Sequence, residues 1–172
     1  MTVPPVDRLS FRRVCGAFPT GVTVVTCRAP TGELHGMTAN SFLSVSLDPL
    51  LMLVSIAQQA TMCQVLEASS SFAVSILAEG QADISNHFAG RRPGLPGTPL
   101  ATVAAAPEAQ VVTGAAAWMV LDKTAMIDAG DHRLFLGAPT VIEASQSAPL
   151  VFHGGRYHEL REGFDAHLLA FL

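Results

Sequence analysis

The feature that most constrains the fold is a succession of short runs rich in β-branched residues, separated by turn residues at short intervals. The first run, VTVVTCR, begins at Val22 and is followed by the turn Pro30-Thr31-Gly32. The second, HGMTANSFLSVS, leads into the turn Asp48-Pro49 and then into the apolar run LLMLVSI. Connections this short favour antiparallel neighbours, because parallel strands need a crossover of a dozen or more residues. The chain is therefore predicted to be mainly β, an antiparallel barrel with a few short helices.

The remaining strands are predicted from four more runs. They are FAVSIL from Phe72, then AAAWMVL, LFLGAPTVI and PLVF, the last ending at the hairpin turn Gly154-Gly155. LLMLVSI is almost wholly apolar, which predicts a strand buried on both faces. Residues 91–107 are rich in Gly, Pro and Ala and are predicted to form a surface loop.

HGMTANSFLSVS is predicted to be one long strand, in which alternate side chains point to opposite faces. One face would carry Met37, Ala39, Ser41, Leu43 and Val45, and the other Thr38, Asn40, Phe42, Ser44 and Ser46.

Short helices are predicted over 7–17, 61–69, 81–88 and 164–171. In the first, Leu9, Val14 and Cys15 are expected to share a face. Thr61 is expected to cap the second, with Gln64 three residues later completing a capping box.

Composition excludes several classes of protein. The 172 residues carry a net charge of -4 with a single lysine, Lys123, and no basic stripe, which argues against nucleic acid or an anionic membrane as partner. No apolar run reaches the ~18 residues of a spanning helix.

Three widely spaced cysteines indicate reduced thiols in a cytoplasmic protein rather than a disulfide framework. Only 14% of residues are charged, so part of the surface is expected to lie in a two-fold dimer interface. We expect one domain over 1–172, with its core at about 8–160.

Several catalytic signatures are absent from the sequence. No two of the fourteen glycines form G-x-G, which removes the Rossmann fingerprint. There is no nucleophile elbow and no HExxH motif, and no histidine pairs with a cysteine at zinc-site spacing, so no metal site is predicted.

The polar groups that remain are short side chains at strand ends and helix starts. Thr38, Asn40 and Ser41 could donate hydrogen bonds to a flat heteroaromatic ring such as a flavin, or could simply face solvent. Thr61 begins a helix, whose N-terminus can bind phosphate, or it serves only as a cap. Arg91 with Arg92 could hold a phosphate, or remain solvated in a loop.

Taken together, these segments resemble the flavin reductase family, the small NAD(P)H:flavin oxidoreductases with the FMN-binding split-barrel fold. The resemblance rests on FRRVCGAFPTGVTVVT, GMTANSFLSVSLDPLLMLVSI, SFAVSIL with the following Q-x-x-x-S-x-x-F-A-G, GDH, and PLVFHGGRY, which run in the family's order from Phe11 to Tyr157. It implies an antiparallel Greek-key split β-barrel and a homodimer with the flavin near the subunit interface.

The resemblance also implies roles for particular residues. His132, of Gly130-Asp131-His132, would be catalytic and meet the nicotinamide. The residues that would bind the cofactors are Thr38, Ala39, Asn40, Ser41, Ser55, Ile56, Ala57, Thr61, Met62, His87, Phe88, Arg91, Arg156 and Tyr157. Within this set, Thr61 and Met62 would receive the flavin phosphate, and Arg156 and Tyr157 would lie with His132 near the nicotinamide.

The activity implied is hydride transfer from NADH or NADPH to non-covalently bound FMN or FAD, with reduced flavin passing to a separate monooxygenase. Three alternatives stay open at this point: an oxidase of the same fold that retains FMN, a flavin carrier or sensor without reductase activity, and a structural dimer that binds no ligand.

Overall fold

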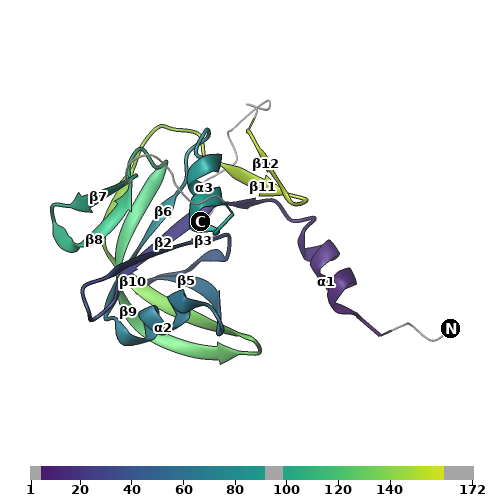
Figure 1. Ribbon diagram of the computed structural model, residues 1–172, viewed down its shortest axis with the longest axis horizontal. Helices are drawn as coiled ribbons and strands as arrows, with labels where there is room; N and C mark the ends of the chain where they lie inside the picture. The colour runs from purple at the N-terminus through teal and green to yellow at the C-terminus, as the bar shows by residue number, and fades with distance from the viewer. Residues whose placement is uncertain (1–4, 92–98, 161–172) are drawn as a thin grey trace.

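The computed structural model describes residues 5–91 and 99–160 (Figure 1). Its helices are α1 (Arg8–Cys15), α2 (Thr61–Ala68) and α3 (Ala82–Phe88). Its strands are β1 (Thr20–Gly21), β2 (Thr23–Arg28), β3 (Leu34–Ala39), β4 (Phe42–Leu47), β5 (Leu50–Ala57), β6 (Ser71–Ile76), β7 (Leu100–Val103), β8 (Ala106–Val112), β9 (Ala117–Ala129), β10 (His132–Ala144), β11 (Val151–His153) and β12 (Arg156–His158). The expected helix over 164–171 lies outside the described residues, as does Arg92.

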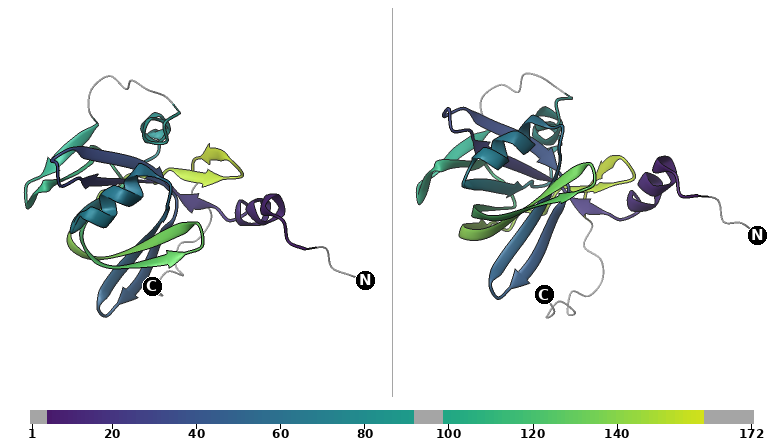
Figure 2. Two further views of the ribbon diagram at one scale, coloured as in Figure 1. Left: turned by 60° about the horizontal axis from the view of Figure 1, so that its bottom comes forward. Right: turned by 90° about the horizontal axis from the view of Figure 1, so that it is seen from below.

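Seven strands form one antiparallel sheet in the order β3-β2-β6-β9-β10-β5-β4. The mainly β, antiparallel prediction is thus confirmed. The sheet is strongly curved but not closed (Figure 2). Its two edge strands, β3 and β4, are consecutive in sequence and are joined only by Asn40 and Ser41. The chain therefore passes from one edge of the sheet to the other through these two residues.

The prediction of one long strand over residues 35–46 was wrong at this junction. The first half pairs with β2 and the second half with β5, at opposite edges of the sheet. A strand cannot hydrogen-bond to both edges without breaking, so regular pairing stops at Asn40 and Ser41. The position of the break is set by the strands with which the two halves pair. A local sequence pattern does not contain that information.

The predicted surface loop over 91–107 was also wrong in part, because β7 and the start of β8 pair as an antiparallel hairpin. β1 pairs with β11 through Thr20 and Gly21. The turns at Gly32 and at Gly154-Gly155 are confirmed, and all three glycines have positive φ.

The main core lies between α2 and the concave face of the sheet, where Leu66, Val54 and Phe135 are fully buried. β5, expected to be buried on both faces, buries only alternate residues, and Leu50 is exposed. The single chain covers one face of this strand and leaves the other face partly open. No helix within residues 5–91 or 99–160 is long and apolar enough to cross a membrane.

α1 stands apart from the sheet body and buries none of its residues (Figure 1). Asp7 caps it, accepting hydrogen bonds from the Leu9 and Ser10 amides at 2.8 and 2.9 Å. These hydrogen bonds, with that from the Ser10 hydroxyl, lower the pKa of the Asp7 carboxyl. Leu9, Val14 and Cys15, which were predicted to share a face of this helix, are all exposed.

The C-terminal end of α2 is held by the only lysine. Lys123 Nζ donates to the carbonyl oxygens of Leu66 and Glu67, both at 2.7 Å, which are among the last carbonyls that a helix leaves without partners. Burial lowers the pKa of Lys123.

We expect Lys123→Met to lower the free energy of unfolding by about 2 kcal/mol, because the apolar stem is kept while charged hydrogen bonds are lost. Chemical denaturation measures this. Gln64→Met, on an exposed position of the same helix, is the matched control and should leave stability within about 0.5 kcal/mol of the parent. Equal stability of the two variants would show that Lys123 does not hold the helix end.

Candidate functional site

A cavity of about 200 Å³ opens beside the end of β3, and we call it the β3 pocket. Five of the residues predicted to bind cofactor line it: Thr38, Ala39, Asn40, Arg91 and Tyr157. The other lining residues are Val22, Ser85, Ala89 and Phe152. Sequence segments as distant as β3 and β12 thus contribute to a single cavity.

Ser85 of α3 ties the walls of the β3 pocket together. It is fully buried, its carbonyl oxygen accepts a hydrogen bond from the Thr38 hydroxyl at 2.7 Å, and its hydroxyl lies 2.9 Å from the Tyr157 hydroxyl. Tyr157 is also 3.2 Å from Asn86 Oδ1. α3 therefore fixes β3 and β12 relative to each other. Sequence reasoning did not select Ser85, although it is the serine of the motif Q-x-x-x-S-x-x-F-A-G.

The junction between the two sheet edges continues this site toward β5. Asn40 is exposed, and its side-chain amide donates to the Thr20 hydroxyl at 3.3 Å. The Ser41 hydroxyl donates to the Ser55 carbonyl at 2.7 Å and accepts from the Ser55 amide at 3.1 Å. The Ser41 hydroxyl therefore ties the residue before β4 to β5. Its proton is engaged in the hydrogen bond to the Ser55 carbonyl.

The end of β5 lies beside the start of β10, where His132 pairs with Ala57 and Leu134 with Ser55. Ile56 between them is fully buried in the core, so only its main-chain groups can serve a ligand. Gln58 closes the strand end, since its amide donates to the Asp131 carbonyl at 3.0 Å. Ser55 and Ala57 are thus placed next to His132, as the predicted site requires.

The side chain of His132 is 44% exposed and is oriented by its neighbour. Its Nδ1 lies 2.7 Å from Asp131 Oδ1, and Arg8 of α1 lies 3.9 Å from the other carboxylate oxygen. The hydrogen bond with His132, followed by the charge of that ring, lowers the pKa of Asp131. The carboxylate therefore stays ionised near neutral pH and can hold the imidazole in one orientation.

α2 begins four residues after β5, and its N-terminus was predicted to receive phosphate. Thr61 is not the cap, contrary to prediction. It is the first helical residue and is exposed, while Ala60 occupies the cap position without a side-chain hydrogen bond. The capping box with Gln64 is therefore absent. A helix start without a side-chain cap leaves its first N–H groups available to an anion. Met62 is buried in the core, so it can offer only its main-chain amide.

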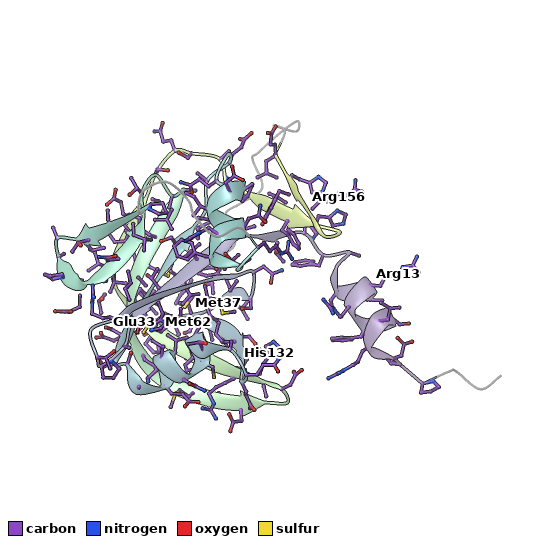
Figure 3. The ribbon with its side chains drawn as sticks, viewed as in Figure 1. Arg13, Glu33, Met37, Met62, His132 and Arg156 are labelled. Carbon is purple, nitrogen blue, oxygen red and sulfur yellow. The ribbon has the colours of Figure 1, made fainter. Side chains whose placement is uncertain are left out.

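Three other predicted residues do not line the β3 pocket. Phe88 packs its ring against Gly36 and meets His87 edge-on, with ring centroids 5.0 Å apart. Arg156 is exposed on the β11–β12 hairpin. In Figure 3, Arg156 and His132 lie apart from each other, both on the side of the body that faces α1. No group of acidic, histidine or cysteine side chains over 5–91 and 99–160 has the arrangement of a metal site.

The β3 pocket has the character that a flavin ring requires. Val22, Ala39 and Phe152 provide apolar walls, and polar groups of Asn40 and Arg91 border them. Flat heteroaromatic cofactors are held by apolar faces with a few hydrogen-bonding groups at their edges. The residues present therefore fit such a group.

Comparison with known proteins gives a consistent result. The chain matches the Flavin reductase like domain family over residues 15–161. It is 41% identical over 170 residues to the NADH-dependent FAD reductase of Streptomyces globisporus, covering 95% of this chain and 91% of that protein. It is 36% identical over 152 residues to the reductase component of 4-hydroxyphenylacetate 3-monooxygenase from Thermus thermophilus, covering 88% of this chain and 95% of that protein. The solved structure of the Streptomyces globisporus C-1027 NADH:FAD oxidoreductase SgcE6 with NAD and FAD fragments matches with a TM-score of 0.86 and 37% identity, covering 96% of this chain and 99% of that one.

Proposed function

The chain belongs to the flavin reductase family, and we propose that it is an NADH-dependent reductase of non-covalently bound FMN or FAD. The observation that carries the proposal is that five residues predicted to bind the cofactors line one cavity. The relatives support NADH as the donor, since the Streptomyces globisporus proteins are named as an NADH-dependent FAD reductase and an NADH:FAD oxidoreductase. We also propose that residues 1–172 form one domain, of which the family match spans 15–161.

A bound flavin would supply the redox chemistry by accepting a hydride from NADH. The residues of this chain bind and orient the flavin and the NADH. Thr38, Asn40 and Arg91 border the ring pocket, and the first amides of α2 hold phosphate. His132, fixed by Asp131, positions the nicotinamide. Much of the rate then comes from holding the two rings in reacting geometry.

The partner is a separate monooxygenase that takes up reduced flavin. The similarity to the 4-hydroxyphenylacetate 3-monooxygenase reductase component supports this division of labour. The thiols of Cys15, Cys27 and Cys63 are free, which supports our proposal of a cytoplasmic protein, because disulfides are rare in that compartment.

The test is NADH consumption measured with no flavin and with added FMN, FAD or riboflavin. We expect turnover only when flavin is present, and mild denaturation should release the flavin intact. Flavin binding without NADH oxidation would identify a carrier or sensor instead. Flavin that stays bound while another substrate reduces it would identify an oxidase, and absence of flavin binding would leave a structural protein.

Thr61→Ala is expected to weaken FMN and FAD binding about tenfold, as loss of a hydrogen bond to a charged phosphate does, with little effect on riboflavin. Because Thr61 does not cap α2, the free energy of unfolding should change by less than about 0.5 kcal/mol. Flavin fluorescence titration measures the three affinities. Thr31→Ala, at an exposed turn, is the control. Equal losses for all three flavins would remove Thr61 from the phosphate site.

We propose that the protein is a homodimer, supported by two exposed apolar surfaces. On α1, Phe11 and Val14 are 61% and 73% exposed, and their i, i+3 spacing puts them on one side of the helix. Phe18, which follows the helix, is 74% exposed. On the edge strand β4, alternate residues Leu43, Val45 and Leu47 are between 45% and 67% exposed. Large exposed apolar surfaces mark interaction sites. A second copy would cover both surfaces by the same two-fold contact.

Leu47→Glu is therefore expected to shift the protein from dimer to monomer, because a charge buried in an apolar interface is costly. Sedimentation velocity at micromolar concentration measures the change. Ile142→Glu, a substitution at another exposed apolar residue, on β10, is the control and should remain dimeric. A parent protein that sediments as a monomer would contradict the proposal directly.

A further inference from the structure

α2 is joined to the β9–β10 hairpin by an arginine whose two acidic partners lie on different elements. Arg133, the second residue of β10, contacts the carboxylate of Glu67 on α2, and its Nε lies 2.6 Å from Asp128 Oδ1 on β9. The side chain of Arg133 is only 23% exposed, and a charge shielded from water gains more from its partners than one on an open surface. One guanidinium group therefore holds α2 against the end of the hairpin.

Arg133 and His132 are neighbours in β10 and point to opposite faces of the sheet, because side chains alternate along a strand. Arg133 pairs with Ile56 of β5, which is buried in the main core, so its side chain lies on the face that α2 covers (Figure 2). His132 pairs with Ala57 and lies on the other face. The same two residues of β10 thus carry the histidine of the site and the arginine that contacts α2.

The main chain of His132 is connected to this ion pair through Gln58. Gln58 Nε2 lies 3.5 Å from Asp128 Oδ1 and 3.4 Å from the His132 carbonyl oxygen. Gln58 belongs to the segment that connects β5 to α2. The carboxylate of Asp128 therefore accepts from both Arg133 and Gln58, and the start of β10 is linked to the entry into α2 as well as to its end.

Glu67 is oriented toward Arg133 by contacts on the buried side of α2. The thiol of Cys63, buried one turn earlier, lies 3.8 Å from Glu67 Oε1, and Lys123 Nζ on β9 donates to the Glu67 carbonyl oxygen at 2.7 Å. The last turn of α2 is therefore fixed to both strands of the hairpin. An α-helix of eight residues is about 12 Å long and moves as one unit, so fixing its end also fixes its start.

We infer that Arg133 is a positioning residue, which keeps the start of α2 and His132 in the fixed relation that aligns flavin with nicotinamide. The inference rests on the proposed function, in which the first amides of α2 hold the flavin phosphate and His132 positions the nicotinamide. Arg133 itself touches neither cofactor and acts through the helix and the strand. Such a residue matters because a misplacement of about 1 Å can cost about 10²-fold in rate.

The test compares FMN with riboflavin, which has the same ring but no phosphate for α2 to hold. Fluorescence titration measures the affinity for each flavin, and stopped-flow absorbance measures the rate of flavin reduction at saturating flavin and NADH. The proteins compared are the parent, Arg133→Gln, Arg133→Lys, Glu67→Gln and Arg28→Gln. Arg28→Gln is the matched control, because the Arg28 side chain is 30% exposed, is paired with Glu108 and does not line the β3 pocket. Chemical denaturation verifies that each variant is folded.

We expect Arg133→Gln to weaken FMN binding about tenfold and to slow the reduction of bound FMN about tenfold. The affinity for riboflavin and its reduction should stay within about twofold of the parent, since the position of α2 does not affect a flavin without phosphate. Glu67→Gln should act in the same direction but less, because the contact with Asp128 remains. Arg133→Lys should recover part of the loss, since lysine keeps the charge but not the planar fork that reaches two carboxylates. Arg28→Gln should match the parent.

Equal losses for FMN and riboflavin in Arg133→Gln would overturn the inference, because they would show a general structural effect. Parental handling of FMN in a folded Arg133→Gln protein would also overturn it. If Arg133→Gln does not fold, Glu67→Gln decides the question, and parental FMN affinity and reduction in that variant would count against the inference. Failure of the proposed function looks different: the parent protein would then not oxidise NADH with any flavin, whatever the variants do.

Discussion

Gly36→Ala is expected to lower the free energy of unfolding by about 1–3 kcal/mol and to weaken flavin binding at least tenfold. A Cβ at this position would lie 2.4 Å from Phe88 Cε1 and 2.6 Å from Phe88 Cδ1. The ring is half-buried and packs against a core cluster, so it cannot turn aside without moving the end of α3. That end carries Ala89 and Arg91, which line the β3 pocket.

Chemical denaturation and flavin fluorescence titration measure the two effects of Gly36→Ala. Gly21→Ala is the matched control, since a Cβ there meets no atom within 4 Å. Stability and flavin affinity should both be retained in the control. A Gly36→Ala protein that binds flavin as tightly as the parent would show that the position of α3 does not govern the pocket.

His132→Ala is expected to lower kcat/KM for NADH at least tenfold while leaving flavin affinity nearly unchanged. Each tenfold loss corresponds to about 1.4 kcal/mol of transition-state stabilisation. The reason is its position: the ring is half-exposed at the start of β10, beside Ser55 and Ala57, and is held by Asp131 at 2.7 Å. It is free to contact the nicotinamide but makes no contribution to the apolar core.

NADH kinetics and flavin titration on one preparation decide whether His132 acts on the cofactor. Asp131→Asn should give a smaller loss, because the ring remains but is less firmly oriented. His35→Ala, which removes a histidine paired with Glu33 on β3, is the control and should have parental kinetics. Loss of stability together with both ligands would make His132 a structural residue. Normal NADH kinetics in a folded His132→Ala protein would remove it from the site.

Short-range features of the structure were predictable from the sequence. β2, β6 and the β11–β12 hairpin follow from β-branched runs and from Gly154-Gly155, because strand propensity and turn conformation depend on neighbouring residues. α3 is confirmed at its predicted position. The ordered motifs were sufficient to identify the family, and they selected residues that meet in the β3 pocket.

Capping and strand boundaries were less predictable, because they depend on distant partners. The capping box expected at Thr61 is absent, since the chain leaves β5 through Gln58 and enters the helix one residue earlier, with Ala60 at the cap. The long strand over 35–46 divides because its halves pair with β2 and β5. Residues 100–103 pair with β8 as one arm of a hairpin, although the composition of this stretch is typical of a loop.

The sequence by itself determined the mainly β class, most of the turns, and the chemistry carried by Thr38, Asn40, Arg91 and His132. Only the tertiary structure decided which of these side chains are available. It buries Ile56 and Met62 in the core, uses the Ser41 hydroxyl to join β4 to β5, and makes Ser85 the link between the walls of the pocket. The physical reason is that burial and hydrogen bonding are properties of surfaces brought together from distant segments. A side chain's chemistry is local, but its accessibility is set by what packs against it.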